Sequence, residues 1–146
     1  MLSPLFYWTL LLTVTIYAFA RGRLDERYAA SICVFATVAT IVVASPLSRK
    51  YSDVEFGVLT VDLLALAAFS AIALRSKRFW PLWVAGFQLT STFAHAMKAV
   101  QLELLPQVYA VAERFWVYPI FLVIVIGTWR GHQRLIRERD RVSIPA

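Results

Sequence analysis

The chain has 146 residues, of which 60% are hydrophobic and 14% aromatic, and its mean hydropathy is +0.64. This composition is too apolar for an ordinary soluble domain, so the sequence predicts a single domain that is surrounded mostly by lipid. The formal net charge of +6 comes from cations beside apolar runs and aromatic residues, which favours anionic phospholipid headgroups as partners and excludes nucleic acid.

Five apolar runs each approach the roughly 20 residues that a helix needs to cross the hydrocarbon core. Because unpaired backbone groups are costly in lipid and no alternating strand pattern appears, each run is expected to be helical. The predicted helices cover residues 2–20, 28–46, 54–74, 79–101 and 107–130. The sequence therefore predicts an all-α integral membrane protein, with one five-helix transmembrane bundle over residues 1–146.

Prolines mark several of the predicted helix ends. Pro4, Pro81 and Pro106 fit first-turn positions, where the missing N–H removes no helix hydrogen bond. Pro119 instead lies inside the fifth run, where it should remove one hydrogen bond and bend the helix. A kink is therefore expected at Pro119.

The first run ends in Ala18, Phe19 and Ala20, an A-x-A pattern that a signal peptidase could cleave. A signal peptide has Lys or Arg before its apolar region, and no Lys or Arg precedes this run. Cleavage would also leave the basic connectors on the wrong side of the membrane. The first helix is therefore expected to be retained.

Cations concentrate on alternate connectors, after the first, third and fifth runs. These cations are Arg21, Arg23, Arg27, Arg75, Lys77, Arg78, Arg130, Arg134, Arg137, Arg139 and Arg141. The opposite side has only Arg49, Lys50, Lys98 and Arg114, several of them beside acidic residues. By the positive-inside rule the N-terminus is outside and the C-terminus cytoplasmic, in a multi-pass protein of a bacterial-type inner membrane.

Polar residues inside the predicted helices form the main candidate site. Asp62 lies in the third run, and a polar stripe at steps of three and four lies on one face of the fourth. Asp62 and His95 have similar depths, so their side chains should come within hydrogen-bonding reach. The expected outward-opening cluster contains Asp62, Gln88, Ser91, Thr92, His95, Lys98, Glu113 and Arg114. The alternative is a helix-packing seam, with Lys98 reaching the membrane interface.

Cofactor chemistry has little support in the sequence. A haem with two His ligands is disfavoured, because His95 lies in the outer third of the fourth helix whereas His132 lies beyond Trp129 on the cytoplasmic side, so their depths do not match. A haem held through His95 would need another kind of ligand or a second copy of the chain. The lone Cys33 excludes a CxxC motif, and no metalloenzyme motif is present. We therefore expect no cofactor and no metal site.

A basic tail follows the fifth run. Arg130, Arg134, Arg137 and Arg141 recur at steps of four, three and four, which predicts one face of a cytoplasmic helical extension over residues 130–141. This face could hold anionic lipid headgroups or an acidic partner. The alternative is a positive-inside anchor with a solvated end.

Three functions remain open from the sequence. The first is an accessory, assembly or interaction subunit of a larger membrane complex, with lipids and other membrane subunits or further copies of the chain as partners. The second is a small transporter or channel that uses Asp62, His95 and Lys98. The third is a membrane protein or enzyme that binds a lipid or small molecule in an outward-facing pocket. Short connectors and the lack of a complete catalytic set favour the first and disfavour an enzyme.

Overall fold

The computed structural model describes residues 4–44, 51–100 and 115–142, with side chains for these ranges except residues 51–55, 98–100 and 142. Five α-helices make up nearly all of this part of the chain, which contains no strand. They are α1 (Pro4–Arg21), α2 (Leu24–Val43), α3 (Tyr51–Arg75), α4 (Trp80–Val100) and α6 (Val117–Val142). The predicted all-helical class is confirmed for the described residues.

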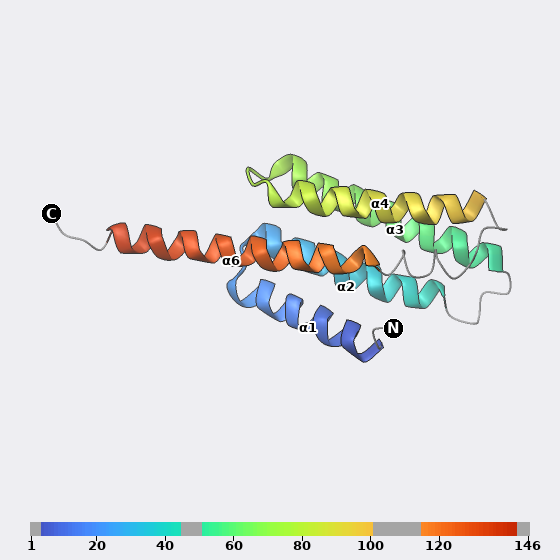
Figure 1. Ribbon diagram of the computed structural model, residues 1–146, viewed down its shortest axis with the longest axis horizontal. Coiled ribbons are helices and arrows are strands. Elements are labelled where there is room, and N and C mark those ends of the chain that lie inside the picture. Colours follow the sequence, from blue (N-terminus) through green and yellow to red (C-terminus); the bar gives the residue numbers. More distant parts are fainter. Residues whose placement is uncertain (1–3, 45–50, 101–114, 143–146) are drawn as a thin grey trace.

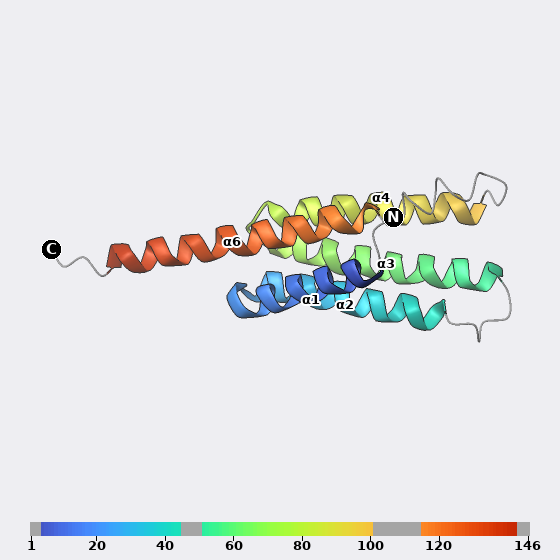
Figure 2. The same cartoon turned by 60° about the horizontal axis from the view of Figure 1, so that its bottom comes forward.

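The helices form an up-and-down bundle in which each packs against the next along the chain (Figure 1). Contacts of α6 with both α4 and α1 close the ring. Residues 22–23 join α1 to α2, and residues 76–79 join α3 to α4. Figures 1 and 2 show both connectors at the same end of the bundle, beside the middle of α6. This basic end brings together three segments that the sequence marked as rich in cations.

Small residues occupy much of the bundle interior, whereas large apolar side chains point outward. The buried small residues are Ala18, Ala29, Ala30, Cys33, Ala65 and Ala73. In contrast, Phe35, Leu64 and Phe93 are 70%, 61% and 64% exposed. Small residues let neighbouring helices approach closely, and exposed apolar surface on this scale needs apolar material to cover it. The described helices therefore pack through small residues inside the bundle and present large apolar side chains on its outer surface.

Two helices are long and apolar enough to cross a membrane: Leu24–Val43, which is α2, and the part of α3 from Phe56 to Arg75. Only 22% and 17% of their most apolar stretches are buried inside the bundle, whereas the core helix of a soluble protein would be mostly buried. The described part of α4 contains the polar residues Gln88 and His95, and the described part of α6 becomes charged after Trp129. The five-span arrangement stays a prediction.

Proline positions agree with the predicted helix starts, with one correction. Pro4 begins α1 and Pro81 lies in the first turn of α4, while Pro106 is outside the described residues. Pro119 was predicted to kink the fifth helix, yet α6 begins at Val117 and places Pro119 in its first turn. There the missing N–H has no intrahelical acceptor to lose. A helix start therefore replaces the expected kink in the described part of the chain.

Candidate functional site

The first polar cluster joins α3 to α4 through the carboxylate of Asp62. His95 Nε2 lies 3.2 Å from Asp62 Oδ2, and Gln88 Nε2 donates to Asp62 Oδ1 at 3.1 Å. Thr92 Oγ1 donates to the Gln88 carbonyl at 2.8 Å and lies 3.5 Å from the Asp62 carbonyl. The close approach of Asp62 and His95 expected from their depths is therefore present. Its functional role stays a prediction.

The inner face of α4 supplies these side chains because their spacing follows the helical repeat. Gln88, Ser91 and Thr92 are at most 7% exposed, whereas the neighbouring Leu89 and Phe93 are 57% and 64% exposed. Asp62 and His95 are also mostly covered, at 16% and 14% side-chain exposure. Buried hydrogen bonds of this kind hold membrane helices together. The geometry fits a helix-packing seam that contains one carboxylate–imidazole pair.

The remaining members of the predicted cluster are outside the described region. Glu113 and Arg114 belong to residues 101–114, and the side chain of Lys98 is not described. Among the described side chains, no three His, Cys, Asp or Glu residues come close enough to hold a metal ion. The structure therefore brings together Asp62, Gln88, Thr92 and His95, with Ser91 on the same buried face.

A second polar cluster ties the first turn of α2 to the connector between α3 and α4 at the basic end. Glu26 is fully buried and forms an ion pair with Arg78, through Oε1 and Nη1. Its other oxygen accepts from the backbone N–H of Arg23 at 2.9 Å. Beside it, Ser76 Oγ donates to Asp25 Oδ2 at 2.7 Å. Carboxylates suit the first turn of α2 because free backbone N–H groups give that end a partial positive charge.

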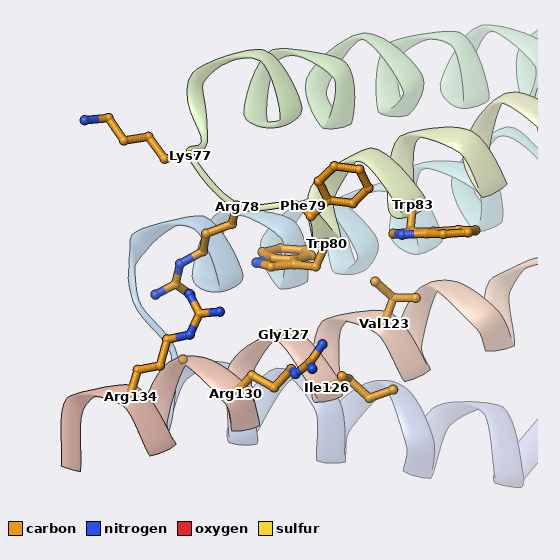
Figure 3. A pocket seen from close by; sticks show the side chains of 11 residues that line it. Lys77, Arg78, Phe79, Trp80, Trp83, Val123, Ile126, Gly127, Arg130 and Arg134 are labelled. Carbon is orange, nitrogen blue, oxygen red and sulfur yellow. The ribbon is translucent and has the colours of Figure 1, made fainter. Parts of the chain in front are cut away.

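A groove of about 520 Å³ opens between the start of α4 and the middle of α6 (Figure 3). Its lining includes four cationic residues and three aromatic residues, which are Lys77, Arg78, Arg130, Arg134, Phe79, Trp80 and Trp83. None of the described residues that line it is acidic. In Figure 3 the guanidinium groups of Arg78 and Arg134 point toward one another, whereas Lys77 points away. Arg130 points instead toward Ile126, so the groove has a pair of arginines at one end, Trp83 at the other, and a further cation between them.

Two glycines of α6 allow this close packing against α4. A Cβ atom at Gly127 would lie 2.9 Å from the ring of Trp80, and one at Gly131 would lie 2.8 Å from Arg78 Nη1. The spacing of four residues puts both glycines on one face of α6. It is the small-xxx-small pattern of closely packed membrane helices.

No protein-family model, curated protein or solved structure matches this chain. The functional argument therefore rests on the two polar clusters, the groove and the course of α6.

The four arginines predicted as one binding face have two different surroundings. Arg130 and Arg134 line the groove. Arg137 and Arg141 are exposed on the last turns of α6, which project beyond the other helices (Figures 1 and 2). The face is therefore divided between the bundle end and the projecting helix.

Glu26 and the two glycines of α6 were not among the predicted site residues, and Arg78 was predicted only as one cation of a basic connector. Gly127 and Gly131 carry a recognisable signal, because the segment Gly-Thr-Trp-Arg-Gly has the small-xxx-small spacing. Glu26 stands among cations of the first basic connector and resembles an ordinary solvated charge. Its burial follows only from the packing of the first turn of α2 against the connector between α3 and α4.

Proposed function

We propose that this chain is a small integral membrane protein that serves as an accessory or interaction subunit of a larger membrane complex. The observation that carries the proposal is the end of α6, which leaves the bundle as a lone charged helix (Figure 2). A projecting helix offers a binding surface without any catalytic group. The function is therefore to hold a partner at the membrane.

The outer surface of the bundle supports placement in a membrane. Large apolar side chains are exposed on α1, α2, α3, α4 and α6, and α2 and α3 have the length and hydropathy of membrane spans. The three cation-rich segments lie at one end, and Arg21 Nη1 is 2.6 Å from His132 Nε2. By the positive-inside rule this end faces the cytoplasm and the N-terminus lies outside, as part of a five-span bundle.

The direction of α6 favours a protein partner for its last turns. The projecting part continues along the long axis of the bundle (Figures 1 and 2). At a rise of 1.5 Å per residue, Arg141 lies about 10 Å beyond Arg134 along the helix. Arg137, Arg139 and Arg141 therefore extend away from the headgroups that surround the bundle end. An acidic surface of a cytoplasmic or membrane partner suits them better than lipid.

Transport through the Asp62–His95 pair is a less supported alternative. An ionisable pair inside a membrane bundle can mark a proton pathway. However, the two oxygens of Asp62 already contact His95 and Gln88, which fits a fixed packing seam. We therefore assign this pair to helix association.

The proposal is tested by purifying the tagged full chain from its native membrane in mild detergent, beside a variant that lacks residues 135–146. We expect the full chain to retain a membrane-complex partner in a fixed ratio and the truncated chain to lose it. Quantitative mass spectrometry measures the ratio. Because the described part of the removed segment, residues 135–142, projects beyond the bundle, both proteins should have the same melting temperature.

Charge variants sharpen this test. Arg137→Gln/Arg141→Gln should lower the amount of bound partner, whereas Glu138→Gln/Asp140→Gln changes as many charges on the same helix and should not lower it. Recovery of the full chain only as a lone monomer would contradict the proposal. Equal loss in the two double variants would contradict recognition of an acidic surface.

A further inference from the structure

We propose that the groove between α4 and α6 binds an anionic phospholipid, with its phosphate held by Arg78 and Arg134 and its acyl chains over Trp83. Arg130, whose guanidinium points toward Ile126 in Figure 3, adds positive charge along the groove. The site is distinct from the projecting end of α6. It rests on the proposed placement of the bundle in a membrane but not on the presence of a protein partner.

The positive charge at the end of the groove where Arg78 and Arg134 lie favours binding of an anion. Arg78 has one carboxylate partner, Glu26, which lies buried behind it. Arg134 points toward Arg78 in Figure 3, so two guanidinium groups face each other with no acidic side chain in the described lining. Like charges this close repel each other, and a shared anion would turn that repulsion into attraction. Guanidinium groups also match phosphate oxygens by paired hydrogen bonds.

The other end of the groove distinguishes a lipid from a free anion. Phe79, Trp83 and Ile126 are 75%, 58% and 42% exposed there. Exposed apolar side chains contribute nothing to binding of inorganic phosphate, whereas they can pack against acyl chains. A volume of about 520 Å³ also suits a headgroup and its glycerol rather than a single small ion.

The position of the groove agrees with this occupant. It lies at the basic end of the bundle, next to both described connectors (Figures 1 and 3). Tryptophan side chains concentrate at membrane interfaces, and basic pockets between helices at the cytoplasmic interface hold anionic headgroups. A phospholipid of the cytoplasmic leaflet would meet the groove with its phosphate and chains already in the required order.

The test uses the delipidated full chain in mild detergent and three added probes: short-chain phosphatidylglycerol, phosphatidylcholine of the same chain length, and inorganic phosphate. Thermal unfolding measures stabilisation, and native mass spectrometry counts bound lipid. We expect only phosphatidylglycerol to raise the melting temperature and to remain bound as one molecule per chain.

A matched pair of variants locates the site. Arg130→Gln/Arg134→Gln removes two groove charges from exposed positions and should weaken phosphatidylglycerol binding by about thirtyfold. Arg137→Gln/Arg141→Gln removes the same charge from the same helix outside the groove and should leave binding within about threefold of the wild type. Because all four side chains are exposed, each variant should retain its fold.

Equal stabilisation by both lipids, stabilisation by inorganic phosphate alone, or equal weakening in the two variants would overturn the proposal. Alkaline carbonate extraction of the membranes separates this failure from failure of the proposed function. A chain that stays in the membrane without preferring phosphatidylglycerol lacks only the lipid site. A chain that is released by carbonate contradicts membrane placement itself.

Discussion

At the scale of single residues, the Glu26–Arg78 pair buries a carboxylate that needs its cation to stay inside the described part of the chain. Its members are 52 residues apart, and the carboxylate side chain is only 1% exposed. Removing one member of a buried ion pair leaves an uncompensated charge away from water. The pair therefore makes the packing of the first turn of α2 against the connector between α3 and α4 depend on both residues together.

Arg78→Gln should lower the free energy of unfolding by about 3–5 kcal/mol, because Glu26 then stays buried without its cation. Titration of the detergent-solubilised protein with SDS measures this loss. Arg75→Gln, which removes an exposed arginine three residues earlier, is the matched control and should change stability by less than about 0.5 kcal/mol. The double variant Glu26→Gln/Arg78→Gln should recover part of the loss. Equal losses for Arg75→Gln and Arg78→Gln would disprove the structural role of the pair.

The residues also show what sequence reasoning could and could not reach. Depth along antiparallel helices was enough to predict that Asp62 lies beside His95, because a rise of 1.5 Å per residue gives the position of each residue along the bundle axis. Height alone could not select Arg78 among the cations of its connector as the partner of Glu26. That choice depends on how this connector turns and packs against the first turn of α2.

At the scale of helices, the length of the apolar runs predicted that the described helices exist, but it predicted the residues at which they begin less well. The second helix was expected from residue 28, whereas α2 begins at Leu24. Its first turn contains Asp25 and Glu26, which do not continue an apolar pattern but do stabilise a helix N-terminus. Pro119 was misread for a related reason, since the apolar run continues past the point where α6 begins. Helix ends depend on local capping more than on hydropathy.

The contact between α4 and α6 predicts unequal effects for two similar substitutions. Gly127→Ala places a methyl group 2.9 Å from the packed Trp80 ring and should lower stability by about 1–3 kcal/mol. Gly131→Ala places a methyl group 2.8 Å from Arg78 Nη1, the atom that pairs with the buried Glu26, while alanine favours the helix by about 1 kcal/mol, so stability should fall by less than for Gly127→Ala. Thermal unfolding in detergent compares the two. A larger loss for Gly131→Ala would show that the helices do not pack in this way.

At the scale of the whole molecule, the gathering of three basic segments at one end predicts a single orientation. A green fluorescent protein fused after residue 146 should be fluorescent in the cytoplasm, and alkaline phosphatase fused there should be inactive. Phosphatase inserted between α2 and α3 should be active, because α2 ends and α3 begins at the opposite end of the bundle. Active phosphatase at residue 146 would reverse the predicted orientation.

The pairing of Glu26 with Arg78 also constrains the order in which the protein can be assembled. At about 5–20 residues per second, Arg78 is synthesised roughly 3–10 s after Glu26. During that interval the hairpin of α1 and α2 exists with a carboxylate whose permanent partner has not yet been made. The first hairpin can therefore reach its final burial only after the second one arrives. A chain that ends between the two hairpins therefore keeps the Glu26 carboxylate without its Arg78 partner.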